Sequence, residues 1–277
     1  MPARRALDPA LYFILAAFLI PAWPLLSWLN QRFFEQDSFY SHGWLILPAI
    51  AILEWERMGR VRPAKRQVSP AGFGIFLLGT LIFVASTLAG THFPAAWGLI
   101  LAAGGAVASL EGFPRLRPYL PPLALLLLMI PLPGTWLLAL TSHLRELSAR
   151  LAVAAANLLG IQAALDGVEV VIPRAPAGPA LTIGAPCSGL RSLLVFTAVG
   201  LFFCLLSRIP VRRRIWLPAV AVLLAPLSNL LRVLGLILLR RLFGAGAVEG
   251  WPHTFLGLGV FGFAFLTFLH FQRKLTR

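Results

Sequence analysis

Residues 217–242 read LPAVAVLLAPLSNLLRVLGLILLRRL, an apolar run long enough to cross a lipid bilayer as one helix. Before the arginines at 240 and 241, its strongly polar residues are Asn229 and Arg232. A charged side chain inside hydrocarbon is expensive, so an intramembrane arginine is a functional hypothesis by default. The run therefore predicts a membrane helix and marks a candidate functional position on it.

The composition of the whole chain supports the same interpretation. Hydrophobic residues make up 58% of the 277 residues and charged residues 12%, whereas soluble domains carry about 25% charged residues. This balance excludes soluble, disordered, collagen-like and disulfide-scaffold classes. The net charge of +14 sits in short clusters between apolar runs, which is typical of membrane topology, and no nucleic-acid motif accompanies it. We expect membrane lipids as partners and no nucleic acid.

Apolar runs bounded by charged or turn residues predict about eight transmembrane helices. They lie near 11–29, 43–56, 71–90, 93–110, 119–135, 187–207, 215–241 and 253–270. The first run lacks a small-residue cleavage site and is too long for a signal-peptide core, so we expect it to be retained. The expected fold is an all-α polytopic membrane protein, with 1–277 forming a single integral membrane domain.

The basic residues predict which side of the membrane each loop faces. With the N-terminus in the cytoplasm, 16 of the 24 lysines and arginines fall on the cytoplasmic side, at 4–5, 57–66, 115–117, 208–214 and 273–277. This asymmetry follows the positive-inside rule and predicts that both termini are cytoplasmic.

The alternation of sides requires that 136–160 does not cross the membrane. His143, Glu146, Arg150 and Asn157 are spaced to share one helix face, which predicts an amphipathic helix in the interface. After it, VEVVI (168–172), PRAPAGP (173–179) and ALTIG (180–184) predict a short hairpin. We expect 136–186 as a whole to be extracytoplasmic or interfacial.

A candidate nucleophile stands where this hairpin ends, in ALTIGAPCSGLRSLLVFTAVGLFFCLL (180–206). Cys187 is expected to begin a helix at the outer interface, where the helix dipole lowers a thiol pKa and favours thiolate. The backbone N–H groups at Ser188 and Gly189 are candidates to hold an oxyanion. Cys204, in the middle of the same run, is expected to be packing only. The two cysteines are too far apart along a helix to pair and predict no metal site.

Three further segments place polar side chains at the same membrane face. At about 1.5 Å per residue along the helix, Arg232 is expected to reach the outer leaflet of the membrane. Asn229, three residues earlier, is expected to lie on the same face of the helix as Arg232. His253 begins the last predicted span, and His42 precedes the second one, in SFYSHGWLILPAI (38–50). A thiolate, a proton-shuttling histidine and a fixed cation are the set that acyl transfer requires.

Two of the candidate residues keep more than one interpretation. His42 binds substrate or caps the second span. Arg191, one turn below Cys187, binds substrate or pairs with Glu249.

These motifs resemble the exosortase/archaeosortase family. The resemblance rests on CSGLRSL (187–193), the N-x-x-R of Asn229 and Arg232, the histidine that begins the last span, YSHG (40–43) and MIPLP (129–133). It implies a multi-spanning cysteine protease and transpeptidase with Cys187, Arg232 and His253 as catalytic residues and no cofactor. Ser188, Gly189, Asn229, His42 and Arg191 are then candidates for substrate binding or support.

The resemblance also implies substrates and a location. The substrates are exported proteins with a C-terminal tripartite sorting signal: a short motif such as Pro-Glu-Pro, a transmembrane helix and a basic tail. They are cleaved through a thioester and transferred to a cell-surface acceptor. The implied location is a bacterial inner membrane, with the active site facing the periplasm or the outside.

Two functions from other classes remain alternatives. A transporter or channel has Asn229 and Arg232 lining an anion path, and it requires polar residues throughout the membrane depth. The predicted spans at 71–110 carry no charged residue, which gives such a path little support. A non-catalytic scaffold protein, the other alternative, predicts no reactive thiol.

Overall fold

The computed structural model describes residues 9–36, 38–57, 65–173, 175–176 and 178–277. Arg4, Arg5, Arg60 and Arg62 of the predicted cytoplasmic clusters lie outside the described residues, as does Arg174 of the predicted hairpin. The chain forms two compact units, Met1–Pro133 and Gly134–Arg277.

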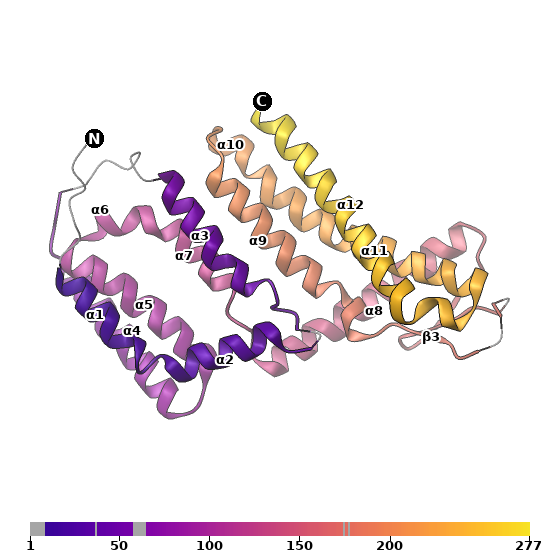
Figure 1. Ribbon diagram of the computed structural model, residues 1–277, viewed down its shortest axis with the longest axis horizontal. Helices are drawn as coiled ribbons and strands as arrows, with labels where there is room; N and C mark the ends of the chain where they lie inside the picture. The colour runs from indigo at the N-terminus through magenta and orange to yellow at the C-terminus, as the bar shows by residue number, and fades with distance from the viewer. Residues whose placement is uncertain (1–8, 37, 58–64, 174, 177) are drawn as a thin grey trace. The chain divides into compact units, whose positions relative to one another are not determined.

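The regular elements in the described part of the first unit are all helices (Figure 1). Its elements are α1 (Pro9–Leu19), α2 (Trp23–Phe34), α3 (Gly43–Arg57), α4 (Pro70–Leu88), α5 (His92–Leu110), α6 (Phe113–Leu116), a 3-10 turn η1 (Arg117–Tyr119) and α7 (Leu120–Leu128). The α4 helix begins where the Ser69 hydroxyl accepts a hydrogen bond from the Gly72 N–H, with Pro70 as the first helical residue.

The α4 and α5 helices pack backbone against backbone. A Cβ added at Gly105 would lie 2.3 Å from the Phe76 backbone nitrogen, and one at Gly79 would lie 2.3 Å from the Ala102 nitrogen. Apolar side chains gain little by leaving lipid for another helix, so membrane helices associate through close backbone approach and van der Waals contact. The glycines therefore determine how α4 and α5 pair.

A second contact in this unit joins two of the motifs noted in the sequence. The Tyr40 hydroxyl accepts a hydrogen bond from the Leu132 N–H at 3.0 Å, which links YSHG to MIPLP. Tyr40 and His42 are both buried, and their rings stack with centroids 6.2 Å apart. Through this hydrogen bond, Tyr40 links the segment before α3 to the segment after α7.

The second unit contains α8 (Gly134–Leu158), β1 (Ala164–Asp166), β2 (Glu169–Val171), β3 (Leu181–Thr182), a 3-10 turn η2 (Ala185–Ser188), α9 (Leu190–Leu206), α10 (Val211–Arg214), α11 (Trp216–Phe243), a 3-10 turn η3 (Ala245–Val248) and α12 (Gly250–Thr276). In Figure 1, α9, α11 and α12 run side by side. Phe196, Leu217 and Phe268 are fully buried between them.

The expectation of eight transmembrane helices is not confirmed. In the described part of the chain, four helices are long and apolar enough to cross a membrane: Pro70–Leu88, His92–Leu110, Val211–Phe243 and Gly250–Thr276. The predicted span at 11–29 is instead a helix pair bent by 67°, and counting that pair as one broken span gives five.

Three other predicted spans form helices that are short for a bilayer. The spans at 43–56, 119–135 and 187–207 correspond to α3, α7 and α9, with 15, 9 and 17 residues. A helix rises about 1.5 Å per residue, so α7 covers only about 14 Å. Prolines at 121 and 122 begin α7 and those at 131 and 133 follow it, and proline lacks the N–H that a longer helix requires.

The segment between α8 and α9 forms a small antiparallel sheet with strand order β1-β2-β3. Asp166 pairs with Glu169, and Val170 pairs with Leu181. The strand at Ala164–Asp166 was not expected from the sequence, whereas β2 and β3 lie within VEVVI and ALTIG. The extracytoplasmic location of this sheet stays a prediction, as does the single membrane domain.

The predicted amphipathic helix at 136–160 corresponds to α8, which is not among the candidate spans. On its exposed face, Arg150 and Glu146 form an ion pair at 2.5 Å. On another face of α8, Ala149, Ala152 and Ala156 are fully buried against the sheet and α11. The small residues let α8 approach the turn that carries Cys187.

Candidate active site

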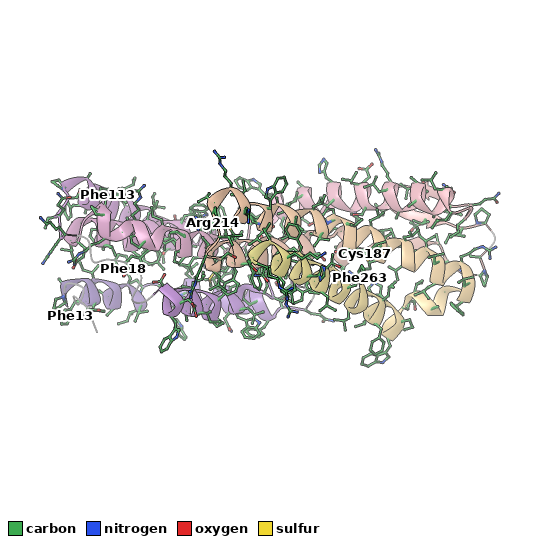
Figure 2. The ribbon with its side chains drawn as sticks, turned by 90° about the horizontal axis from the view of Figure 1, so that it is seen from above. Phe13, Phe18, Phe113, Cys187, Arg214 and Phe263 are labelled. Carbon is green, nitrogen blue, oxygen red and sulfur yellow. The ribbon has the colours of Figure 1, made fainter. Side chains whose placement is uncertain are left out.

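Cys187 lies in a turn rather than in a helix. It is the third residue of η2, and α9 begins three residues later at Leu190. Gly189 joins the two with φ of 81°, a left-handed conformation that other residues adopt at a cost. The thiol is 5% exposed and packs among Val170, Ile183 and Val233. Figure 2 shows Cys187 at the end of α9 that lies away from Arg214.

The structure brings Cys187 together with a histidine and an arginine from two other helices. The Cys187 Sγ lies 3.7 Å from His253 Nε2, in the first turn of α12. The Arg232 Nη2, on α11, lies 3.1 Å from the same nitrogen. The Arg232 Nη1 donates a hydrogen bond at 3.2 Å to the Pro186 carbonyl, next to the cysteine.

The donor at Arg232 fixes the protonation of His253 in this geometry. A guanidinium only donates hydrogen bonds, so His253 Nε2 must accept, and the ring proton is on Nδ1. The Nε2 lone pair therefore faces both the arginine and the thiol. A neutral imidazole in this orientation can take the proton of the Cys187 thiol.

Backbone carbonyls around the cysteine are held by two further side chains. The Asn229 Nδ2 donates to the Cys187 carbonyl and to the Ser148 hydroxyl oxygen, both at 2.9 Å. The Ser148 hydroxyl donates at 3.4 Å to the Ser188 carbonyl. Asn229 lies on α11 and Ser148 on α8, so two helices fix one turn.

The expectation that Cys187 has a lowered pKa is wrong for this resting geometry. Burial raises the pKa of the Cys187 thiol, while the charge of Arg232 and a hydrogen bond between the thiol and the Gly184 backbone lower it. The sequence suggested the first turn of a helix, where the dipole favours thiolate. Instead, the thiol stands before the helix in apolar surroundings, which favour the neutral form.

Comparison with known families identifies the chain. The family model for transmembrane exosortases matches residues 28–270, most of the chain. The chain belongs to the transmembrane exosortase family. Together with its apolar helices, this makes it a multi-pass membrane protein. No curated protein and no solved structure matches it.

The match to the exosortase model covers both units and every candidate site residue.

The five other residues proposed from the sequence have different surroundings. Ser188 is buried, and its hydroxyl accepts from the Leu190 N–H at 3.4 Å. Gly189 lies against Asn229. Arg191 is half-buried in the first turn of α9. Asn229 holds the Cys187 carbonyl, as described above.

His42 belongs to the first unit and contacts Tyr40 there. Burial lowers the pKa of His42, and backbone groups of Leu128 and Phe39 act in the opposite direction. Within the second unit, the histidine that lies beside Cys187 is His253. A supporting role for His42 stays a prediction.

Two residues that contact the candidate site, Ser148 and Gly257, were not predicted from the sequence. Ser148 reaches the cysteine turn from α8, whose polar face drew attention to other residues. Gly257 lets Arg232 lie against α12, because a Cβ there would be 3.2 Å from the Arg232 Nε. One signal was available: Gly257 follows His253 by one helical turn, and only a small residue leaves room for a neighbouring guanidinium.

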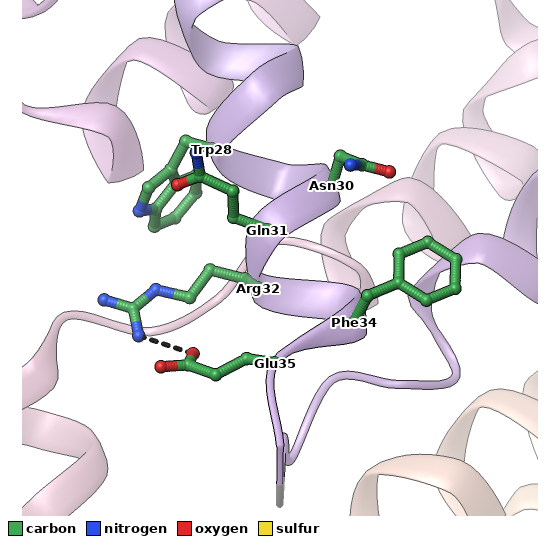
Figure 3. A pocket seen from close by; sticks show the side chains of 6 residues that line it. All are labelled: Trp28, Asn30, Gln31, Arg32, Phe34 and Glu35. Carbon is green, nitrogen blue, oxygen red and sulfur yellow. Dashed lines mark hydrogen bonds and ion pairs between the residues drawn. The ribbon is translucent and has the colours of Figure 1, made fainter.

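A separate hollow of about 500 Å³ lies along α2 in the first unit (Figure 3). Trp28, Asn30, Gln31, Arg32, Phe34 and Glu35 line it, and Arg32 and Glu35 form an exposed ion pair at 2.9 Å. None of these lining residues is a nucleophile.

Proposed function

We propose that the chain is a membrane cysteine protease and transpeptidase with Cys187 as nucleophile, His253 as proton shuttle and Arg232 as fixed cation. One observation carries the proposal: the Cys187 Sγ and the Arg232 Nη2 converge on the same nitrogen of His253, at 3.7 and 3.1 Å. These three residues come from a turn and two helices, up to 66 positions apart in the sequence. Such convergence of nucleophile, base and cation supports acyl transfer.

In the first half of the reaction, the Cys187 sulfur attacks the carbonyl carbon of the scissile peptide bond. The thiol proton moves to His253 Nε2, which then donates rather than accepts and so releases the Arg232 N–H. That N–H and the first amides of α9 stabilise the oxyanion of the tetrahedral intermediate. When the C–N bond breaks, His253 gives its proton to the leaving amine, and an acyl thioester to Cys187 remains.

In the second half, a nucleophile from a cell-surface acceptor attacks the thioester carbonyl. Its proton passes to His253 Nε2 and from there to the departing Cys187 sulfur. The thiol is thereby restored and the acceptor carries the substrate. Resolution by water instead of an acceptor makes the same site a protease.

The substrates we propose are exported proteins with a C-terminal sorting signal composed of a short motif, a transmembrane helix and a basic tail. The long apolar helices α11 and α12 carry Arg232 and His253, which supports a substrate that is itself anchored in the membrane. Binding energy from the substrate helix would position the scissile bond at Cys187. We place the site at the outer face of a bacterial inner membrane, with both termini in the cytoplasm.

The hydrogen bonds of Asn229 and Arg232 favour catalysis over a transporter. The donors of Asn229 and both terminal nitrogens of Arg232 are directed at His253, at Ser148 and at the turn that contains Cys187. An anion path requires those donors to face a water-filled channel. In this chain those donors instead bind His253 and the backbone of the turn that contains the Cys187 thiol.

The test is carried out in the native organism from which the gene has been deleted. The deletion strain is complemented with the wild-type chain, with Cys187→Ala or with Cys204→Ala, and the C-terminal peptides of exported proteins are identified by mass spectrometry. We expect wild type and Cys204→Ala to remove hydrophobic C-terminal helices from a set of exported proteins, and Cys187→Ala to leave those helices attached.

Cys204 is the matched control because it is the second free thiol of the chain, within α9. If Cys187→Ala removed the C-terminal helices as the wild type does, the proposed nucleophile would be wrong. If deleting the gene left every C-terminus unchanged, the sorting reaction itself would be excluded.

A further inference from the structure

In the turn that contains Cys187, three successive backbone carbonyls each accept a hydrogen bond from a different side chain. The Pro186 carbonyl accepts from Arg232, the Cys187 carbonyl from Asn229 and the Ser188 carbonyl from Ser148. Arg232 already belongs to the proposed catalytic set. The other two donors are not accounted for by the chemistry of acyl transfer.

The donors and acceptors of this network are fixed by its chemistry. A backbone carbonyl only accepts, so the group of Asn229 that faces Cys187 must be the amide NH₂. The same NH₂ has a second hydrogen, which goes to the Ser148 oxygen. The Ser148 hydroxyl proton is then available for the Ser188 carbonyl. Every donor in this short chain has a partner.

The surroundings make the network costly to break. Asn229 and Ser188 are 3% and 2% exposed, and Ser148 is half-buried. An unsatisfied buried polar group costs about 1–3 kcal/mol, so removing either side chain leaves its neighbour unpaired. The left-handed Gly189 packs against Asn229, with only 3.0 Å between a Cβ built there and the Asn229 Cγ.

We infer that Asn229 and Ser148 are positioning residues that hold the Cys187 turn so that its sulfur stays opposite His253 Nε2. This inference rests on the proposed function. Neither residue touches the sulfur, and each acts through the backbone of 187–188. Ser148 brings α8 into the active site, although its sequence predicts only an amphipathic surface helix.

The geometry explains why two donors are required. Cys187 lies in a short 3-10 turn between a two-residue strand and α9, and such turns have weak internal hydrogen bonds. The distance from Sγ to Nε2, 3.7 Å, is near the limit for a hydrogen bond to sulfur. A displacement of about 1 Å in a reacting group can lower a rate by about 100-fold. Rigid attachment to α8 and α11 prevents that displacement.

The experiment uses the full-length chain in lipid nanodiscs and in the complemented deletion strain, with Cys204→Ala as background. The variants are Asn229→Asp, Ser148→Ala and Ser148→Thr. Asn229→Asp keeps the shape but loses the donor, whereas Ser148→Thr keeps the hydroxyl. Ser228→Ala is the matched control, because its buried hydroxyl donates only within its own helix, to Ala225 at 2.8 Å.

Two quantities are measured for each variant. One is the fraction of exported protein with its C-terminal helix removed in cells. The other is the rate of Cys187 alkylation by iodoacetamide as a function of pH, which needs no substrate. A purely structural role lowers the yield of folded protein without changing the pH profile of the folded fraction.

We expect Asn229→Asp to slow processing by about 10- to 100-fold and Ser148→Ala by about 3- to 10-fold, with a changed alkylation profile in both. Ser148→Thr should restore processing to within about threefold of wild type, and Ser228→Ala should match wild type in both measurements. Combining Ser148→Ala with Asn229→Asp should cost less than the two single effects together, because the two side chains are hydrogen-bonded to each other and hold the same turn.

Wild-type processing and alkylation in both Asn229→Asp and Ser148→Ala, while Cys187→Ala abolishes processing, would overturn the inference and leave the proposed function intact. Equal losses in Ser148→Thr and Ser148→Ala would also overturn it, because bulk rather than the hydroxyl would then matter. Processing that survives Cys187→Ala would instead refute the proposed function, and the alkylation profile would still test the two positioning residues.

Discussion

The α4–α5 pair and the Cys187 site solve the same problem, holding backbone segments together in an apolar environment, by opposite means. In α4–α5, glycines remove the side chains, so that the Gly105 and Phe76 backbones touch directly. At Cys187, the side chains of Asn229 and Arg232 donate hydrogen bonds to the carbonyls of a turn that has few hydrogen bonds of its own. The first solution gives a rigid scaffold, and the second places reactive atoms.

The difference follows from what each region must leave free. Helices satisfy their own backbone hydrogen bonds, so two of them need only shape to pair in a membrane. Cys187 lies outside the regular helices, in a short turn, and each buried carbonyl released from regular structure must find a donor. The side chains of Ser148, Asn229 and Arg232 therefore reach from their helices to the carbonyls of this one turn.

The largest effect is expected at the histidine of the site. His253→Ala should lower the processing of exported proteins by about 10²- to 10⁴-fold, the usual contribution of general acid–base catalysis. His270→Ala, an exposed histidine on the same α12 helix, should leave processing unchanged. Processing is followed by mass spectrometry of C-terminal peptides. Equal activity in the two variants would show that the Cys187 site is not catalytic.

A smaller loss is expected when the turn itself is strained. Gly189→Ala places a Cβ at a φ of 81° and 3.0 Å from the Asn229 Cβ and Cγ, so the turn must shift. We expect processing to fall by about 10- to 100-fold. Gly184→Ala, whose nearest neighbour is the Pro186 side chain at 3.5 Å, should retain wild-type processing. Wild-type processing in Gly189→Ala would mean that the position of the turn does not limit the reaction.

Substitutions between α4 and α5 should change the stability of the protein rather than its processing activity. Gly105→Ala puts a Cβ 2.3 Å from the Phe76 nitrogen, and overpacking of this kind costs about 1–3 kcal/mol. Its neighbour Gly104 has its nearest atom 4.0 Å away, so Gly104→Ala should be neutral or stabilising by up to about 1 kcal/mol. Denaturation midpoints in detergent measure both. Indistinguishable midpoints would refute backbone packing as the basis of the pair.

The smallest effect concerns the pH dependence of the thiol. Because burial raises the pKa of Cys187, alkylation should increase with pH through a midpoint above that of an ordinary cysteine. The charge of Arg232 opposes burial, so Arg232→Gln should move the midpoint upward. Stopped-flow alkylation in a Cys204→Ala background gives the profile. A midpoint below the ordinary value would restore the preformed thiolate that the sequence suggested.

Much of the fold could be predicted from hydrophobicity alone. The ends of α4, α5 and α11 lie within a few residues of the predicted spans, because long apolar runs have one stable form in a bilayer. The breaks were missed: Pro121, Pro122, Pro131 and Pro133 shorten α7, and 11–29 bends into two helices. These prolines are present in the sequence, but hydropathy alone does not report that proline interrupts a helix.

The sequence by itself determined the class of protein, the apolar helices and the candidates Cys187, Arg232 and His253, because rare polar residues in apolar runs are conspicuous. Tertiary structure decided that His253 lies beside the thiol, that Cys187 lies in a buried turn, and that Ser148 reaches this turn from α8. The physical reason is that helical periodicity fixes which residues share a face. Only packing between helices decides which faces meet.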